Sequence, residues 1–263
     1  PTTWLSRTER SLHQAEKLSI IEKKYPDQFR LVKTRSDLTA ILNIRRTGQK
    51  IVGGILGIEG LHALDGKLEN VDRLFSAGFR IMGLQHFFDN KLGGSLHGES
   101  NSGLTKFGYQ VLRKMSSKGI IIDLAHSSEQ VVKDVLSEFA SPVVVSHTGF
   151  KGHCDSARNI NDALMKNIAQ QGGIIGVGFW DGAVCGGEIS DIVEAIKYGK
   201  SLVGIDHISL GSDFDGTIIS PIDASQLVIL TDALMKDGFS EKEIRKIMGE
   251  NFVNFFKEQL PAN

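Results

Sequence analysis

The chain has 263 residues, of which 41% are hydrophobic, enough for one large core. Its 30 basic and 31 acidic residues leave a net charge of -1, and no basic face stands out, which argues against a nucleic-acid partner. The longest apolar runs, such as residues 119–122, are far shorter than the about 20 residues of a membrane span. We therefore expect a soluble protein, cytoplasmic or periplasmic, without a transmembrane segment.

Hydrophobic periodicity predicts an amphipathic helix over 4–24, a weak strand candidate over 29–32 and a helix over 36–46. After these, strands and helices alternate. The expected elements are strand 51–58 and helix 67–77; strand 80–85 and helix 105–118; strand 119–124 and a helix opened by Ser127; strand 142–147 and helix 161–171; strand 173–179 and helix 188–199; and strand 207–212 with helices 223–236 and 241–257.

This alternation implies a parallel sheet with right-handed crossovers. No linker or repeat divides the chain, so we predict one domain over residues 1–263 with the (β/α)8 TIM-type barrel fold. Six strands are clear where a closed barrel needs eight. The first one or two strands are therefore expected upstream of Pro1. The polar loop 89–103 follows a strand end, and we expect it to be a flexible binding loop or lid.

Four predicted strands lead into a charged or metal-capable residue: Glu59, His126, His147 and Asp213. Buried strands do not tolerate such groups without partners, and the carboxyl ends of parallel barrel strands form one catalytic face. The pattern therefore favours a metal-dependent hydrolase. Simpler readings stay open: Glu59 as a loop carboxylate, each histidine as a core residue, and Asp213 with Asp215 as a turn pair.

Three further residues lie close to these strand ends. His86 ends the strand over 80–85 and is suited to hold a metal or to donate to an oxyanion. Arg158, in the loop after His147, is suited to grip a carboxylate, although most loop arginines are solvated. Asp123 either orients a ligand or pairs with a backbone amide. The default for the other histidines is a structural, loop or surface role: His13, His62, His97, His153 and His207.

Ser36, Ser127 and Ser240 are the expected helix N-caps, the last two with glutamine or glutamate three residues on. Phe179-Trp180 is expected either to wall a pocket or to pack in the core. The two cysteines, Cys154 and Cys185, exclude a disulfide scaffold but allow one bridge.

Taken together, these motifs resemble the membrane (renal) dipeptidase family, peptidase family M19. The resemblance runs from about residue 10 to 258. It rests on six elements in family order: Gly-Ile-Glu59-Gly with His62 soon after, Gly-Leu-Gln-His86, Ile-Asp-Leu-Ala-His126-Ser, Val-Val-Ser-His147-Thr, Ala-Arg158-Asn159 and Gly-Ser-Asp213-Phe-Asp-Gly.

The resemblance implies a zinc-dependent dipeptidase that hydrolyses dipeptides with a metal-activated bridging water and two zinc ions per complete site. Glu59 would bridge both metals, and His126 and His147 would complete the shell of one. His86 would contact the scissile carbonyl, and Arg158 would bind the carboxylate of the substrate. Asp213 would carry the proton to the leaving amine. A homodimer is one expected assembly.

The family holds its other metal with a His-x-Asp pair on the first barrel strand, and no such pair precedes Glu59 here. We expect that the pair lies upstream of Pro1; the alternative is that this homologue has lost it. Two rival functions accordingly stay open. One is another metal-dependent amide or lactone hydrolase on the same barrel. The other is a non-catalytic homologue that keeps half of the metal site.

Overall fold

The computed structural model describes residues 5–262 of the chain. Its strands are β1 (Phe29–Leu31), β2 (Val52–Gly54), β3 (Leu56–Ile58), β4 (Phe79–Gly83), β5 (Ile121–Asp123), β6 (Val144–Thr148), β7 (Ile174–Val177) and β8 (Ile208–Leu210). Its α-helices are α1 (Arg7–Lys24), α2 (Arg35–Arg46), α3 (Asn70–Ala77), α4 (Lys106–Ser117), α5 (Glu129–Glu138), α6 (Asp162–Gln170), α7 (Asp181–Val184), α8 (Ile189–Val203), α9 (Leu227–Lys236), α10 (Glu241–Arg245) and α11 (Asn251–Gln259). Short helical turns are η2 (Leu61–Leu64), η3 (Ile205–His207), η4 (Ala224–Gln226) and η5 (Lys246–Glu250).

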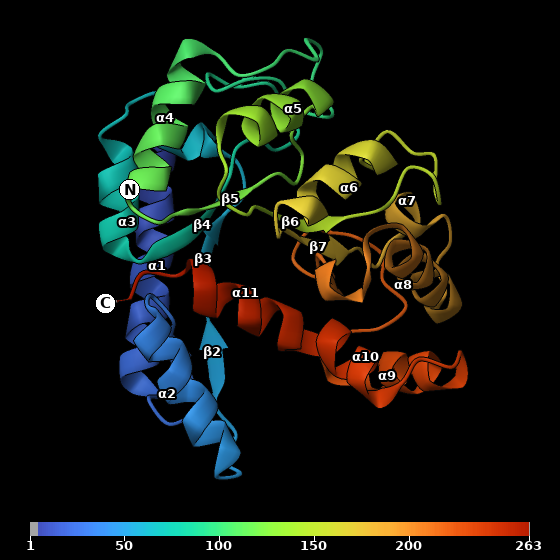
Figure 1. The fold of residues 1–263 in the computed structure, drawn as a ribbon. Helices are drawn as coiled ribbons and strands as arrows, with labels where there is room; N and C mark the ends of the chain where they lie inside the picture. The colour runs from blue at the N-terminus through green and yellow to red at the C-terminus, as the bar shows by residue number, and fades with distance from the viewer. Residues whose placement is uncertain (1–4, 263) are drawn as a thin grey trace.

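The main sheet has six strands in the order β3-β4-β5-β6-β7-β8, and every neighbouring pair is parallel. Helices surround it on the outside, as Figure 1 shows. The parallel α/β prediction is confirmed. Among the described residues, β3 and β8 each pair on one side only within this sheet.

The segment predicted as one strand over 51–58 is divided by Ile55 into β2 and β3. β2 pairs in parallel with β1, so the weak strand candidate near residue 29 is a real strand. It does not join the main sheet. Instead, the β1–β2 ribbon forms a separate two-stranded sheet beside α2, below the main sheet in Figure 1.

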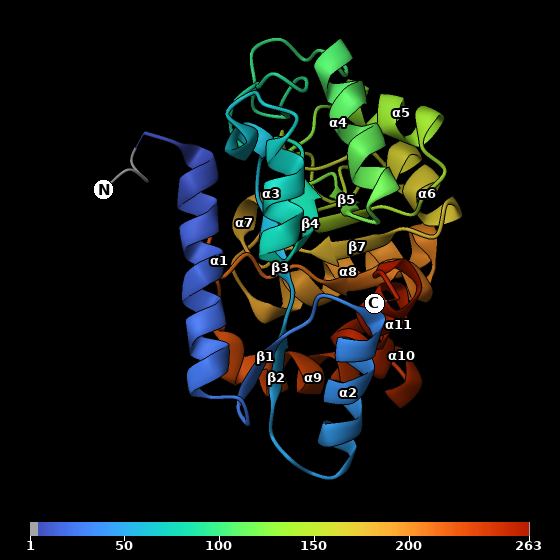
Figure 2. The same cartoon turned by 90° about the vertical axis from the view of Figure 1, so that its left-hand side faces the viewer.

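Strands of the main sheet are buried on both faces, which explains their unbroken apolar runs. In β5, Ile121 belongs to one hydrophobic cluster and Ile122 to another, because successive side chains point to opposite sides of a strand. Val144 and Val145 of β6 divide in the same way. Figure 2 shows α1 standing along one side of the molecule, beside the β3 end of the sheet.

The N-cap residues of two helices differ from those expected from the sequence. The N-cap of α2 is Thr34, which forms a capping box with Asp37, and not Ser36. The N-cap of α5 is Ser128, and not Ser127, whose hydroxyl binds Gln85 instead. Ser240 caps α10 as predicted. The helix predicted over 241–257 is kinked at Gly249, where φ is 154°.

Trp4, the first residue of the helix predicted over 4–24, lies outside the described residues. Within residues 5–262, no helix has both the length and the apolar character needed to cross a bilayer.

The backbone of loop 89–103, expected to be a flexible binding loop or lid, is held by hydrogen bonds with its own side chains. Asp89 accepts hydrogen bonds from the backbone amides of Ser95, at 2.7 Å, and Ser100, at 2.9 Å. Asn90 donates to the Leu84 carbonyl at 2.7 Å, and residues 92–95 are buried. The loop therefore presents its side chains from a fixed backbone.

Candidate metal centre and active site

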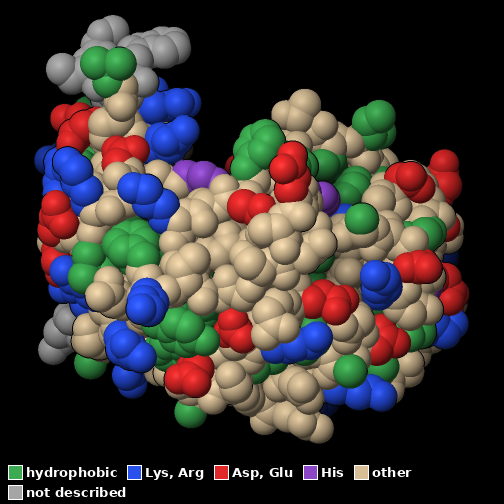
Figure 3. Space-filling model, turned by 90° about the horizontal axis from the view of Figure 1, so that it is seen from above, with side chains coloured by type: hydrophobic (Ala, Val, Ile, Leu, Met, Phe, Trp, Pro, Cys, Tyr) green, Lys and Arg blue, Asp and Glu red, His purple; other side chains and the backbone are tan. Residues whose placement is uncertain are grey.

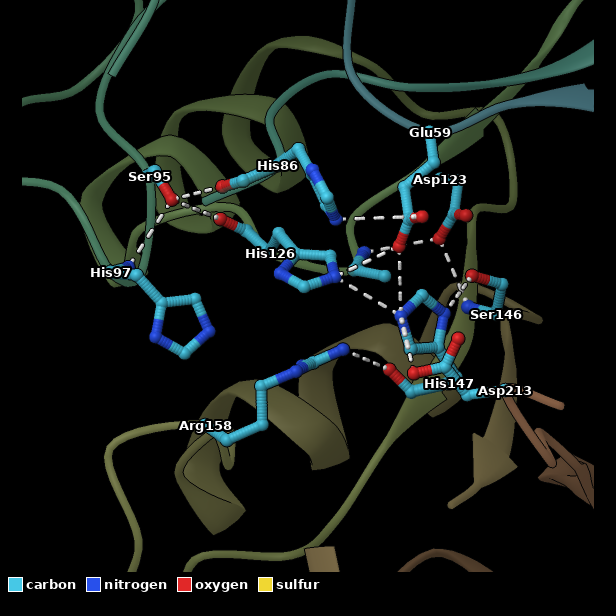
Figure 4. A network of polar contacts seen from close by, with 11 residues as sticks. Glu59, His86, Ser95, His97, Asp123, His126, Ser146, His147, Arg158 and Asp213 are labelled. Atoms are coloured by element: carbon cyan, nitrogen blue, oxygen red, sulfur yellow. Dashed lines mark hydrogen bonds and ion pairs between the residues drawn. The ribbon is translucent and has the colours of Figure 1, made fainter. Parts of the chain in front are cut away.

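The carboxyl ends of the strands bring the predicted polar residues into one cluster, shown in Figure 4. Glu59 follows β3 directly, His147 lies within β6, and His126 follows β5 by three residues. His126 has φ of 63°, a left-handed conformation that is costly for a residue with a Cβ atom. The backbone turns at His126, after the end of β5, and the imidazole of His126 packs against that of His147.

Three ligand-type atoms meet at the centre of this cluster. The Nε2 atom of His126 lies 2.9 Å from Oε1 of Glu59 and 3.1 Å from Nε2 of His147, and Nε2 of His147 lies 3.1 Å from the same Oε1. Ligands bound to one zinc ion at about 2.1 Å are roughly 3.0 to 3.4 Å apart. Two imidazoles and a carboxylate are also a donor set that zinc accepts. These residues therefore fit a zinc ion.

The charges of this trio suit a cation as well. Burial alone would raise the pKa of Glu59, but hydrogen bonds from His126 and His147 outweigh it and hold that pKa well below its usual range. Burial lowers the pKa of His126 to about 4, although its hydrogen bond with Glu59 opposes the shift. At neutral pH the pair is thus a carboxylate beside a neutral imidazole, the protonation states that bind metal.

The imidazoles of His126 and His147 differ in the hydrogen-bond partner of Nδ1, the ring nitrogen that does not contact Glu59. Nδ1 of His147 lies 2.8 Å from the Ser146 hydroxyl. If the hydroxyl accepts the Nδ1 proton, Nε2 keeps its lone pair for a metal. Nδ1 of His126 is buried and has no hydrogen-bond partner among the described residues. Ser146 was not singled out from the sequence, although it directly precedes His147.

His86 lies on the outer side of Glu59. Its Nε2 atom is 3.5 Å from Oε2 of Glu59, the carboxylate oxygen that does not contact the other two histidines. The edge of its ring packs on Phe87 and on His126, with ring centroids 4.5 and 4.7 Å apart. His86 is thus close to the metal trio but outside its closest contacts.

Asp213 approaches the trio from the far end of the sheet. β8 ends at Leu210, and Asp213 takes a left-handed conformation with φ of 58°, which leaves Oδ2 4.0 Å from Nε2 of His147. A Cβ atom on Gly211 would lie 2.7 Å from the Gly176 backbone, so glycine permits this approach. Asp215 is exposed, because the strand does not continue to residue 215.

Burial raises the pKa of Asp213, and the charges of Glu59 and Asp215 raise it further against the opposing effect of His147 and Arg158. Because a raised pKa brings a carboxyl group closer to the working pH, Asp213 is better able to exchange a proton than an exposed aspartate.

Arg158 is buried and only 7% exposed, unlike most loop arginines. Its Nη2 donates to the His147 carbonyl at 2.8 Å, while Nη1 is buried without a partner among the described residues. The guanidinium carbon lies 5.5 Å from the Trp180 ring. Burial lowers the pKa of Arg158 to about 10, which leaves it charged at neutral pH. An unpaired buried cationic donor is expected to have an anionic partner.

A disulfide connects the two loops that position Arg158 and Trp180. Cys154 and Cys185 are bonded, with Cα atoms 5.4 Å apart, so the single bridge that the sequence allowed is present. Asn159 adds hydrogen bonds to the carbonyls of Cys154, at 2.8 Å, and Ala183, at 3.0 Å. Phe179 is fully buried and Trp180 only partly, so the first packs in the core and the second lines the site.

One oxygen of Asp123 holds the backbone before both imidazoles. Oδ1 accepts from the amide of Ala125 at 3.0 Å and from that of Ser146 at 2.9 Å, and each of these residues directly precedes a histidine of the trio. Of the two roles considered from the sequence, pairing with a backbone amide is therefore confirmed, and it orients both strand ends.

We expect Asp123→Ala to weaken zinc binding by about 10- to 100-fold, because two backbone amides lose their acceptor and the strand ends move. The measurement is zinc affinity by chelator competition. Asp123→Asn keeps the accepting oxygen and should bind zinc within a few-fold of the unsubstituted protein. Equal zinc affinity in the alanine variant would show that Asp123 does not position the histidines.

Besides Ser146, two residues not expected at the site come from loop 89–103, His97 and Ser95. The His97 ring centroid lies 5.6 Å from that of His126, although the sequence favoured a structural role for His97. The Ser95 hydroxyl donates to the carbonyls of His86 and His126. No sequence signal separates these residues from the rest of a polar loop. His207, by contrast, contacts the Gly173 carbonyl at 2.9 Å, as a structural residue would.

The cluster is open to solvent on one side. Seen from above, histidine side chains are visible in a recess of the surface in Figure 3. A cavity of about 580 Å³ lies beside Glu59 and His86, and its other walls include Gly57, Ile58 and the Arg7 and Arg10 side chains of α1. The cavity thus follows the free edge of β3.

Comparisons with known proteins show what the chain as a whole is similar to. A family model described as membrane dipeptidase (peptidase family M19) matches residues 2–263. An amidohydrolase structure from Pseudomonas aeruginosa is 26% identical with a TM-score of 0.84, covering 94% of this chain and 84% of that chain. The dipeptidase AC, a metallopeptidase of family M19, is 24% identical with a TM-score of 0.84, covering 96% and 77%. A metallopeptidase from Rhodobacter sphaeroides, solved with a phosphinate mimic of the dipeptide L-Ala-D-Ala, is 24% identical with a TM-score of 0.82, covering 93% and 73%.

Proposed function

The chain belongs to the membrane dipeptidase family, peptidase family M19, and from this premise we propose that it is a zinc-dependent dipeptidase. The observation that carries the proposal is the convergence of Glu59, His126 and His147 at 2.9 to 3.1 Å, with Asp213 and an incompletely paired Arg158 beside them. This set supplies metal ligands, a proton carrier and a carboxylate-binding group in one place.

Glu59, His126 and His147 would hold one zinc ion. Oε2 of Glu59 faces away from the two histidines, so the same carboxylate can serve a second zinc, as we propose for the complete site. Its remaining ligands would come from outside residues 5–262. Bound zinc would make a water molecule acidic and polarise the substrate carbonyl.

His86 would stabilise the developing oxyanion, and Asp213 would transfer the proton. Nε2 of His86 would donate to the carbonyl oxygen as negative charge develops there. Asp213 would accept a proton from the attacking water and deliver it to the leaving nitrogen as the C–N bond breaks. The products are a free amine and a carboxylic acid, so one water is consumed and the aspartate is regenerated.

Arg158 would define the substrate as a dipeptide. Nη1 of its buried guanidinium has no partner within the described part of the chain, and a carboxylate one residue beyond the scissile bond would satisfy it. Longer peptides place no carboxylate at that position. The proposal of dipeptide hydrolysis therefore depends on Arg158 more than on the metal ligands.

We also propose that the complete protein forms a closed (β/α)8 barrel. The support is the free edge of β3 and of β8 and the cavity of about 580 Å³ between α1 and the β3 edge. Further strands between β3 and β8 would cover both edges, which are otherwise unfavourable in a parallel sheet.

Hydrolysis of alanine-containing dipeptides by chelator-treated and zinc-reloaded protein tests the function. We expect no hydrolysis without metal and recovery on zinc addition, with one or two zinc ions per chain by elemental analysis. Absence of zinc binding would refute the metal site. Full zinc occupancy without hydrolysis of any small amide would favour the non-catalytic homologue.

Arg158→Met should raise KM for a dipeptide by about 100-fold, because a charge-assisted hydrogen bond to the carboxylate is lost. The unsubstituted enzyme should prefer the dipeptide over its C-terminal amide, and the variant should lose this preference. Arg113→Met, at an exposed arginine of α4, is the matched control. Equal rates of the unsubstituted enzyme on dipeptide and amide would favour the rival amide or lactone hydrolase.

A further inference from the structure

Two rings at the mouth of the site have no role in the proposed chemistry. Phe87 is 50% exposed although it is adjacent to His86 in the chain, and His97 is also exposed. Their ring centroids are 5.2 Å apart, and they lie 5.5 and 5.6 Å from the ring of His126. Phe87 and His97 therefore form one small aromatic surface beside a proposed metal ligand, which we call the aromatic shelf.

The backbone beneath the shelf is fixed. Ser95 is fully buried, and its hydroxyl reaches the carbonyls of both His86 and His126. The Leu96 amide donates to the His126 carbonyl at 2.7 Å, and the His97 amide donates to the Ser95 hydroxyl at 3.2 Å. Since the shelf is attached to the metal-site backbone on both sides, a ligand does not have to order it before binding.

The shelf lies where a substrate side chain would leave the main chain. The dipeptide would be anchored at its scissile carbonyl by His86 and at its carboxylate by Arg158. The side chain of the C-terminal residue branches between these two anchors. Figure 4 shows His97 facing the same space, to one side of the line from His86 to Arg158.

We propose that Phe87 and His97 form the subsite for the C-terminal side chain of the dipeptide, and that the enzyme prefers an aromatic residue there. This inference rests on the proposed dipeptidase function. Two aromatic rings tilted by 41° offer a face and an edge to a third ring, and such ring contacts stabilise binding beyond the burial of apolar area. An acidic side chain is less suited, because half of the shelf is an apolar ring.

The test compares kcat/KM for Ala-Phe, Ala-Ala and Ala-Glu. The zinc-loaded enzyme should prefer Ala-Phe over Ala-Ala by about 10-fold, and His97→Ala and Phe87→Leu should each bring this ratio close to 1. His13→Ala, at a half-exposed histidine of α1, is the matched control and should keep the ratio. Melting temperatures establish that each variant is folded.

Calorimetric binding of the product amino acids separates this inference from the proposed function. Phenylalanine should bind the zinc-loaded protein more tightly than alanine, and His97→Ala should remove the difference. That result supports the shelf even if no dipeptide is hydrolysed, in which case the dipeptidase proposal alone fails. A Phe/Ala ratio that both variants leave unchanged, or a preference for Ala-Glu that His97→Ala abolishes, would overturn the aromatic subsite.

Discussion

Asp213→Asn is expected to lower kcat for a dipeptide by about three orders of magnitude while zinc binding is retained. The amide keeps the shape of the side chain but cannot accept a proton from water and pass it to the leaving nitrogen, a function worth about 10²- to 10⁴-fold. Oδ2 of Asp213 is 4.0 Å from Nε2 of His147, farther than the atoms of the trio are from each other, so zinc affinity should change little. Single-turnover kinetics and zinc titration measure the two effects.

Asp215→Asn is the matched control, because Asp215 is two residues away but exposed. Its turnover should stay within about 2-fold. Stability provides a second control. The pKa of Asp213 is raised in the folded protein, chiefly by burial, so its ionised form opposes folding above that pKa. The metal-free asparagine variant should therefore be at least as stable at neutral pH. Unchanged turnover in Asp213→Asn would remove Asp213 from the mechanism.

Glu59→Gln is expected to lower zinc affinity by at least 100-fold and to abolish hydrolysis with it. Oε1 of Glu59 contacts both His126 and His147, and among residues 5–262 no other acidic group lies within 3.5 Å of both. Glutamine removes the negative charge that a divalent ion needs and replaces one oxygen by an amide nitrogen that cannot act as a ligand. Equilibrium dialysis with elemental analysis measures bound zinc.

Glu69→Gln, at an exposed glutamate before α3, should bind zinc like the unsubstituted protein. Hydrolysis in Glu59→Gln should not recover at millimolar zinc if Glu59 also links a second ion, whereas it should recover partly if Glu59 serves one ion only. Zinc affinity equal to that of the unsubstituted protein would place the metal elsewhere.

Much of the candidate site could be predicted because the ends of buried parallel strands can be recognised in a sequence. A buried parallel strand appears in the sequence as a short apolar run. A polar residue that directly follows such a run lies at the carboxyl edge of the sheet. Glu59, His126, His147 and Asp213 were predicted on this argument, and the structure brings all four together. His86 follows the same rule beside them.

Residues in loops could not be predicted in this way. Arg158 and His97 lie in polar segments whose composition is typical of solvated loops, yet Arg158 is buried and His97 packs near His126. The N-cap of α5 moved from Ser127 to Ser128 because Gln85, from a distant strand end, binds the Ser127 hydroxyl. Such competition between partners depends on contacts between segments that are far apart in the chain.

By itself, the sequence determined the parallel α/β class, the order of strands and helices and the residue types delivered to one edge, since these follow from local periodicity and from the two-sided burial of parallel strands. Only the tertiary structure decided which atoms meet. It placed Oε1 of Glu59 between two imidazoles and turned Asp213 inward while Asp215 faces solvent. It also left one nitrogen of Arg158 without a partner among residues 5–262. These outcomes depend on left-handed turns, close glycine contacts and a disulfide between distant loops, and no local pattern encodes such long-range geometry.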